Sequence, residues 1–301
     1  MGLLAGVGTA MGVGIMAAVA LEGGRGRRRV GLGVAILGLL IPFLLSPADA
    51  FGRFVVGLTT SLAVIRSIDL YRSQETLPWW RRGWHNVAIF DTRLARPMPR
   101  RLNGALFGLS IAWAALGAAA LCGALMVPVE APVGRGARWI GGAVAAVALL
   151  ESFTRFLRMA YEGIGVAIPD LHDSPYLSRS VREFWGRRWN KVVGTWLRQN
   201  CYEPFRENGR PFVGQCAAFA ASALLHWYLA FVALGFMWSL AMGAFFLLQV
   251  ALIGAEDKFG VHQWSRLAAH SWTVAVMLAV SPLFIEPFLL VVASAAPGSA
   301  R

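Results

Sequence analysis

Residues 211–254, PFVGQCAAFAASALLHWYLAFVALGFMWSLAMGAFFLLQVALIG, contain no Asp, Glu, Lys or Arg. A helix that crosses a membrane needs roughly 20 apolar residues, because the hydrocarbon core is about 30 Å thick. This stretch is too long for one crossing, so we expect two helices that separate near Leu234-Gly235. A chain that contains such a helical pair is expected to be a membrane protein.

The composition of the whole chain agrees with this interpretation. Of its 301 residues, 57% are hydrophobic and only 15% are charged. Soluble domains are about half apolar and a quarter charged. The composition therefore excludes a secreted disulfide scaffold, a disordered tail and an ordinary cytosolic enzyme. The net charge of +12 is confined to clusters between long uncharged stretches, so we predict no nucleic-acid partner.

We predict about eight membrane-spanning helices in all. They cover residues 3–21, 30–46, 52–66, 104–127, 137–157, 211–231, 235–254 and 268–294. The segment 52–66 is the weakest of them, because Arg53 and Arg66 bracket it. The expected fold class is all-α, a polytopic transmembrane helical bundle with amphipathic interfacial helices. We expect one domain over residues 1–301, with a motif-bearing loop at 158–210.

Basic residues predict the orientation, since Lys and Arg collect on the cytoplasmic side of a membrane. With the N-terminus outside, all but four of the 28 Lys and Arg residues fall in or beside cytoplasmic loops. The loops are 22–29, 67–103, 158–210 and 255–267, and the four exceptions are Arg53, Arg135, Arg138 and Arg301. No basic region precedes segment 3–21, which predicts a retained span. The expected location is a bacterial inner membrane, or the endoplasmic reticulum of a eukaryote.

One ionisable residue, His226, lies deep in the predicted span 211–231. Ionisable residues inside a membrane are costly and indicate function by default. A neutral imidazole can act as a general base. The alternative is a histidine that is hydrogen-bonded to a neighbouring helix and has no chemical role. Cysteine and histidine spacings predict no metal site, and His85 and Asn86 are expected in a surface loop.

The loop 158–210 contains a second candidate feature. Ser180 and Glu183 have the spacing of a capping box, which predicts that a helix begins there. At about 100° per residue, the following tryptophans share one face of that helix and basic residues lie opposite. The aromatic face comprises Trp185, Trp189, Val192 and Trp196. The basic residues opposite it are Arg187, Lys191 and Arg198, while Arg188 lies to one side. The pattern predicts an interfacial helix, which serves either as a membrane anchor or as a receptor for an anionic substrate.

Asn190 lies between these two faces. A side-chain amide in this position can donate hydrogen bonds to a developing oxyanion. The run from Ser178 to Asn190, S-x-S-x-x-x-F-W-G-R-R-W-N, resembles the signature of the wax-synthase branch of the membrane-bound O-acyltransferases. The segment Phe219 to His226 resembles the span that carries the active-site histidine of that family. His226 follows Asn190 by 36 residues, which agrees with the order of the asparagine and the histidine in the family.

The resemblance implies transfer of an acyl group from acyl-CoA to the hydroxyl of a lipophilic alcohol, with no cofactor. His226 corresponds to the base and Asn190 to the second polar residue. Arg187, Arg188 and Lys191 are candidates for binding CoA phosphates. Trp185, Trp189 and Trp227 are expected to shape the substrate tunnel. Ala223 and Trp227 depart from the residues that wax synthases often have at these positions.

Three alternatives remain at the level of sequence. The acceptor can be a terpenoid, a sterol or another natural-product alcohol instead of a long-chain alcohol. A transporter would show several intramembrane charges and inverted internal symmetry. A structural membrane subunit would not require an Asn and a buried His at this spacing. The sequence predicts no oligomeric state.

Overall fold

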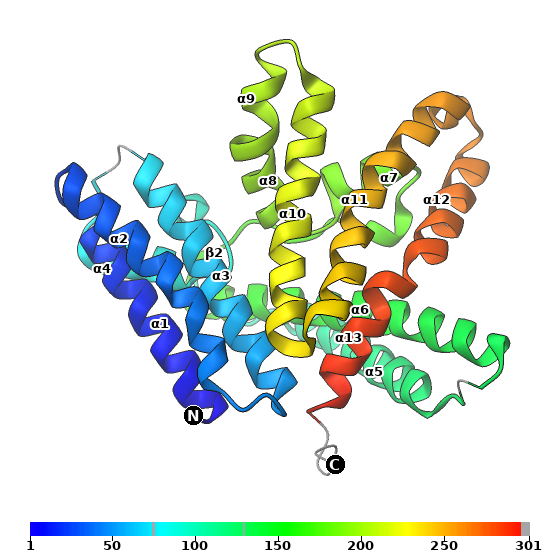
Figure 1. The fold of residues 1–301 in the computed structure, drawn as a ribbon, viewed down its shortest axis with the longest axis horizontal. Helices are drawn as coiled ribbons and strands as arrows, with labels where there is room; N and C mark the ends of the chain where they lie inside the picture. Colours follow the sequence, from blue (N-terminus) through cyan, green and yellow to red (C-terminus); the bar gives the residue numbers. More distant parts are fainter. Residues whose placement is uncertain (74–75, 129, 296–301) are drawn as a thin grey trace. The chain divides into compact units, whose positions relative to one another are not determined.

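A computed structural model of the chain describes residues 1–73, 76–128 and 130–295 (Figure 1). Helices dominate the described residues, and the one strand pair joins Arg96–Pro97 to Val166–Ala167 in antiparallel register. The all-α fold class predicted from composition is confirmed. The described residues form two compact units. The first comprises Met1–Arg93, Leu225–Leu240 and Leu290–Arg301, and the second comprises Leu94–Leu224 and Ala241–Leu289.

The first unit is built on the helices α1 (Leu3–Ala20), α2 (Arg25–Leu37), α3 (Ala50–Arg72) and α4 (Trp79–Val87). Small residues line the buried side of α1, so that α2 and α3 pack beside it (Figure 1). A short 3₁₀ helix, Gly38–Leu44, follows α2. The hydroxyl of Tyr228, in the C-terminal part of α10 (Pro211–Leu234), donates a hydrogen bond of 2.7 Å to the carbonyl of Leu39 in that segment. This part of α10 belongs to the first unit.

Helix α4 has its polar side inward. His85 and Asn86 are 0% and 1% exposed, while Trp79 and Trp80 are largely exposed. The amide nitrogen of Asn86 donates to Ala63 O and Ser67 Oγ, at 3.3 and 2.9 Å. The predicted surface loop at His85 and Asn86 is therefore wrong. Polar groups are buried here because partners on α3 satisfy them.

Helix α1 approaches α4 so closely that only glycine fits at position 14. A Cβ on Gly14 would lie 2.4 Å from Asn86 Oδ1 and 3.2 Å from Ala63 Cβ, whereas a Cβ on Gly12 would meet nothing within 4 Å. We expect Gly14→Ala to lower the free energy of unfolding by about 1–3 kcal/mol, because Asn86 can yield only by losing its hydrogen bonds to α3.

The matched control is Gly12→Ala, which should leave stability unchanged or raise it slightly because alanine favours a helix. The measurement is thermal unfolding of the purified variants in one detergent. Equal melting temperatures for the two variants would show that the contact between Gly14 and Asn86 is absent.

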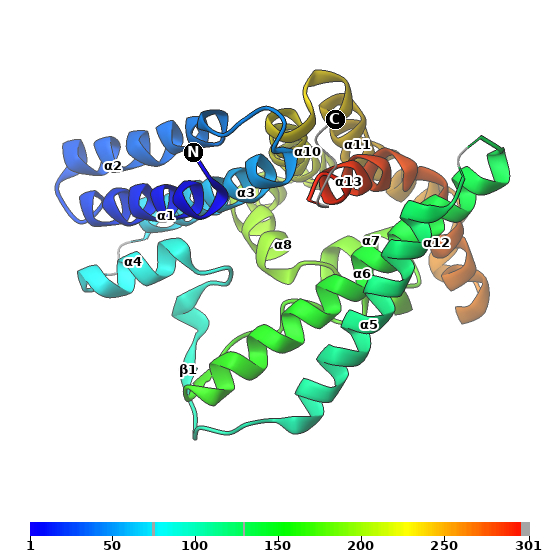
Figure 2. The ribbon, with the colours of Figure 1, turned by 90° about the horizontal axis from the view of Figure 1, so that it is seen from below.

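In the second unit, α5 (Gly104–Met126) and α6 (Pro132–Gly163) form a helical hairpin (Figure 2). The hydroxyls of Ser110 and Ser152 each donate to the other residue's carbonyl, at 2.9 and 2.8 Å. Such interhelical bonds satisfy polar groups where no water is present. At the C-terminal end of α6, the Arg101 guanidinium forms a 3.0 Å ion pair with Glu162.

The remaining chain begins with the segment that carries the motif and continues into four longer helices. Its short helical elements are η3 (Pro175–Leu177), α7 (Val181–Glu183), η4 (Phe184–Arg188), α8 (Lys191–Leu197), η5 (Arg198–Tyr202) and α9 (Glu203–Arg206). The longer helices are α10 (Pro211–Leu234), α11 (Phe236–Phe259), α12 (Arg266–Val280) and α13 (Pro282–Ala293). The predicted separation near Leu234-Gly235 is confirmed, and Gly235 has a positive φ of 85°.

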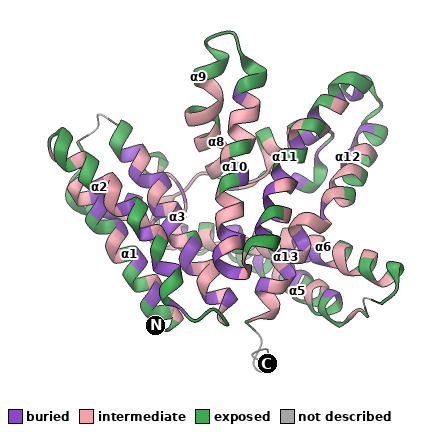
Figure 3. Ribbon diagram, viewed as in Figure 1, coloured by how far each residue is buried: buried purple, intermediate pink, exposed green. Residues whose placement is uncertain are grey.

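Among the described residues, six helices are long and apolar enough to cross a membrane, or up to seven if a bent pair counts as one span. The six are α1, α3, α5, α6, α10 and α11, and the bent pair is α12 with α13. Helix α3, the segment expected to be weakest, is the most buried of the six (Figure 3). Its basic residues are compatible with a long helix because each has a partner. Arg53 bonds the Leu45 carbonyl and Arg66 pairs with Asp69.

Two predicted spans differ from the structure. Segment 30–46 is not one α-helix, because α2 begins among four arginines and gives way to the 3₁₀ helix that contains Pro42. Proline lacks the N–H that an α-helix would use. Segment 268–294 is bent by 57° between α12 and α13, where Pro282 begins the second helix.

Candidate functional site

The motif segment does not form the continuous helix that its periodicity predicts. Ser180 caps a helix start as expected, since its Oγ accepts from Glu183 N at 2.8 Å. The chain then passes through the π-helical turn η4 and breaks at Trp189 and Asn190. Asn190 has a left-handed backbone with φ of 38°. The single aromatic face predicted across residues 185–196 is therefore wrong, because periodicity ends at this break.

Asn190 is fixed through both its backbone and its side chain. Its Oδ1 accepts from Val193 N at 3.3 Å and so caps α8. Its backbone N–H donates to Nδ1 of His172 at 3.0 Å. Within the described residues, the Nδ2 amino group donates no hydrogen bond. Because the hydrogen bond to Oδ1 holds the side chain, the two N–H groups on Nδ2 have a fixed position. They can therefore donate to the oxygen of a ligand.

The three basic candidates have different environments. Arg188 pairs with Glu183 at 2.8 Å and donates to the Asp173 carbonyl at 2.9 Å. It therefore fastens the motif to the preceding loop. Arg187 is exposed and Lys191 is half-buried. These two are the side chains better placed to receive an anion.

The Glu183 carboxylate stays charged in this arrangement. Burial by itself would raise its pKa, but hydrogen bonds from the Arg179 backbone and the Arg188 side chain lower the pKa below its usual range. A charged Glu183 balances Arg188 and completes the helix start, because its Oε2 accepts from Arg179 N at 2.8 Å.

Trp185 holds the motif segment against α10 and α11. Its Nε1 donates to Gln249 Oε1 at 3.0 Å, and its ring contacts Phe219, Phe245 and Phe246. Trp189 lies edge to face with Trp185 and stacks on Phe184, with ring centroids 5.4 Å apart in the stacked pair. The structure brings Trp185, Trp189 and Asn190 together in the second unit. Their predicted role in a tunnel stays a prediction.

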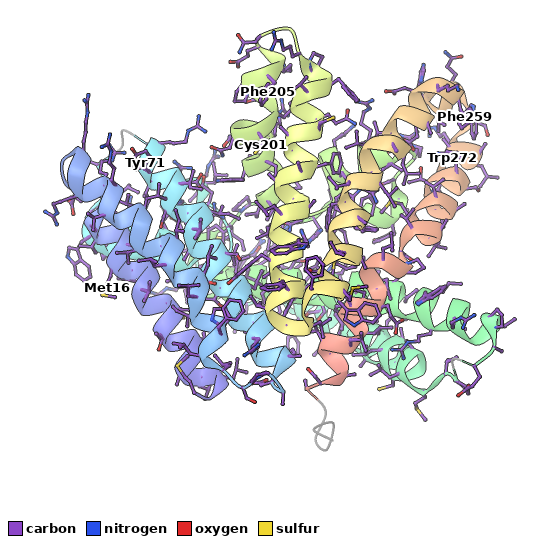
Figure 4. All side chains as sticks on the ribbon, viewed as in Figure 1. Met16, Tyr71, Cys201, Phe205, Phe259 and Trp272 are labelled. Atoms are coloured by element: carbon purple, nitrogen blue, oxygen red, sulfur yellow. The ribbon has the colours of Figure 1, made fainter. Side chains whose placement is uncertain are left out.

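Helices α11 and α12 hold the start of the motif segment. The carboxylate of Glu256 accepts from Val181 N at 2.7 Å, and His270 Nδ1 bonds the Ser178 carbonyl at 2.9 Å. Phe259 and Trp272 pack edge to face with ring centroids 5.8 Å apart, where α11 and α12 lie side by side (Figure 4). The sequence did not predict Gln249, Glu256 and His270 as supports, since no periodicity links residues that are 64 to 92 positions apart.

His226 and Trp227 lie on α10, which contributes to both units. Its residues up to Leu224 belong to the second unit, and those from Leu225 belong to the first. His226 is half-buried. The ring of Trp227 stacks on Phe231, with centroids 5.0 Å apart and planes 6° from parallel. Asn190 and His226 thus fall in different compact units.

No metal centre is evident in the described part of the chain, where no group of three His, Cys, Asp or Glu residues is placed to hold an ion. The reactive groups that remain are a half-buried histidine in a span and an asparagine at a backbone break.

One segment of the chain is similar to a known family. Residues 168–248 match the membrane bound O-acyl transferase family. This segment contains both Asn190 and His226, so the resemblance inferred from the motif is confirmed over the residues that carry it.

Individual relatives match further residues. Probable long-chain-alcohol O-fatty-acyltransferase 1 of Arabidopsis thaliana is 31% identical over 111 residues, which are 34% of this chain and 33% of the relative. Probable long-chain-alcohol O-fatty-acyltransferase 7 of the same plant is 31% identical over 120 residues, or 36% and 35% of the two chains. Acyl-CoA–sterol O-acyltransferase 1 is 53% identical over 32 residues, or 11% and 9%. The chain spans about a third of the length of the curated long-chain-alcohol relatives it matches.

Proposed function

We propose that this protein transfers an acyl group from acyl-CoA to the hydroxyl of a lipophilic alcohol and so forms an ester. The observation that carries the proposal is the state of Asn190. Hydrogen bonds hold its backbone N–H and its Oδ1 in place, and among the described residues its Nδ2 has no acceptor. Asn190 also lies in the segment that matches the acyltransferase family.

The reaction requires little covalent chemistry from the protein. A thioester is already activated, so the alcohol oxygen can attack its carbonyl carbon once a base removes the hydroxyl proton. In our proposal His226 takes that proton and Asn190 stabilises the oxyanion of the tetrahedral intermediate. The C–S bond then breaks, and the proton passes from His226 to the departing thiolate of CoA.

We assign the CoA phosphates to Arg187 and Lys191, since Arg188 is engaged within the loop. The acyl chain and the alcohol are expected to enter from the lipid. A long-chain alcohol is the proposed acceptor, because relatives with that printed specificity match the longer parts of the chain. A sterol or terpenoid alcohol is the second candidate, because a sterol acyltransferase is 53% identical to this chain over 32 residues.

The apolar helices make this an integral membrane protein. We further propose that the motif segment faces the cytoplasm of a bacterial cell. Loops 67–103, 158–210 and 255–267 contain most of the Lys and Arg residues, and an even number of spans separates each from the next. The N-terminus is placed outside if the apolar part of α2 and the following 3₁₀ helix cross together. From Val30 to Leu44 they extend about 26 Å at 1.5 and 2.0 Å per residue, against a hydrocarbon core of about 30 Å.

The test is ester formation by the purified protein in nanodiscs. Palmitoyl-CoA would be supplied with hexadecanol, a sterol or diacylglycerol, and both ester and released thiol would be measured by mass spectrometry. We expect one thiol per ester with hexadecanol. Ester formed only with the sterol would select the second acceptor class. An absence of ester with every acceptor, together with an absence of CoA binding, would contradict the acyltransferase and favour a transporter or a structural subunit.

A further inference from the structure

Three consecutive contacts join the loop 171–173 to the break in the motif segment. Asp173 N donates to Arg188 O at 2.9 Å, and Lys191 N donates to Leu171 O at 2.8 Å. Between these two backbone bonds, Asn190 N donates to the imidazole Nδ1 of His172 at 3.0 Å. The two outer bonds use only backbone groups. The central bond is the one that depends on a particular side chain.

The backbone at Asn190 requires such a partner. Its left-handed conformation, with φ of 38°, lies outside both helices that flank it. A residue there has no helical carbonyl to receive its N–H, and an unpaired buried N–H is costly. Because asparagine tolerates this conformation better than most residues, the pair of Asn190 and His172 makes the break compatible with folding.

The contact also fixes the protonation state of the imidazole. An N–H can donate only to a nitrogen that carries a lone pair, so Nδ1 is unprotonated and the neutral ring carries its proton on Nε2. The surroundings agree, since burial and the nearby charge of Arg155 lower the pKa of His172 to about 4. Arg155, on α6, is itself paired with Glu151. His172 is therefore a neutral acceptor at neutral pH.

Ring packing holds the imidazole independently of this hydrogen bond. His172 lies edge to face with Trp189, at a centroid distance of 5.1 Å. Trp189 in turn stacks on Phe184. The packing role and the acceptor role of His172 can thus be separated by substitution, because an aromatic hydrocarbon preserves the first and removes the second.

We propose that His172 is a positioning residue, whose Nδ1 holds the backbone of Asn190 so that the Asn190 amide meets the oxyanion of the acyl-transfer reaction. The inference rests on the proposed function and deepens it. His172 needs no contact with either substrate. Its removal therefore changes the rate of the chemical step and leaves substrate binding unaltered.

Two variants test the acceptor. His172→Phe keeps a ring against Trp189 and loses Nδ1. His172→Asn can place its Oδ1 where Nδ1 lies. With palmitoyl-CoA and hexadecanol, we expect the Phe variant to lose tenfold to about a hundredfold in kcat at unchanged KM, since small misplacements of a catalytic group have effects of this size. The Asn variant should recover most of the rate.

A spectroscopic measurement tests the contact without reference to activity. The chain contains five histidines, which can be labelled with ¹⁵N in the ring. At neutral pH, the resonances absent from the His172→Asn variant should be those of a neutral imidazole protonated at Nε2. A ring protonated at Nδ1, or a charged ring, would contradict the hydrogen bond. Melting temperatures of the variants in detergent identify any loss of folding.

The outcomes separate this inference from the function on which it rests. Wild-type kcat in a folded His172→Phe variant would overturn the positioning role, even if the wild-type protein forms ester as proposed. Equal losses in the Phe and Asn variants would also overturn it, because the acceptor would then be irrelevant. If the wild-type protein forms no ester with any acceptor, the proposed function fails and the positioning role fails with it, while the ¹⁵N spectra still decide whether the contact exists.

Discussion

Replacement of His226 by Ala is expected to reduce ester formation by about 10²- to 10⁴-fold, the usual contribution of a general acid or base. The reason is that the hydroxyl of an alcohol is a weak nucleophile at neutral pH and needs a base as it attacks. His226 is half-buried on a membrane-spanning helix and lies in the matched acyltransferase segment. The measurement is kcat with palmitoyl-CoA and hexadecanol, in nanodiscs of one lipid composition.

The control is His262→Ala, which removes an exposed imidazole from the loop after α11. It should leave turnover and stability unchanged. Thermal unfolding of both variants separates lost chemistry from lost folding, because His226 also contacts its surroundings. Ester formation at the wild-type rate by a folded His226→Ala protein would rule out the base assignment.

The second large effect is expected at Asn190. Asn190→Asp keeps an oxygen that can accept from Val193 N, and aspartate also tolerates the left-handed backbone. It removes the Nδ2 donor and places a negative charge beside the oxyanion. We expect a loss of about 10²- to 10³-fold in kcat, as for removal of one oxyanion donor, with little change in melting temperature.

Asn208→Asp is the matched control for this exchange of amide and carboxylate. Asn208 is exposed and its Nδ2 bonds the nearby Pro204 carbonyl, so its replacement should not alter kcat. If Asn190→Asp folds and turns over like this control, then Asn190 is a structural cap for α8 and the oxyanion role is wrong.

Local patterns predicted much of the fold and of the candidate site. Apolar length identified the helices, since a membrane-spanning backbone must satisfy its hydrogen bonds within the segment. The capping spacing of Ser180 and Glu183 identified the start of α7. The motif identified Asn190 and His226, and the family match covers both.

Other features escaped local reasoning for a physical reason. The break at Asn190 interrupts a sequence whose periodicity is helical throughout, and its partner His172 lies in an irregular loop 18 residues earlier. A surface helix usually turns its apolar side to the interior, but α4 buries its polar side. It does so because the hydrogen-bond partners of that side are on α3. A pattern along one segment carries no information about partners on another.

Hydropathy and motif spacing are properties of neighbouring residues, so the chain alone was enough to predict a helical membrane protein with a segment similar to the membrane bound O-acyl transferases. The tertiary structure alone decided how that motif is held. Gln249, Glu256 and His270 fasten its first half, and His172 fastens the backbone of Asn190. These supports come from distant positions because a left-handed break and an open loop cannot satisfy their own backbone groups.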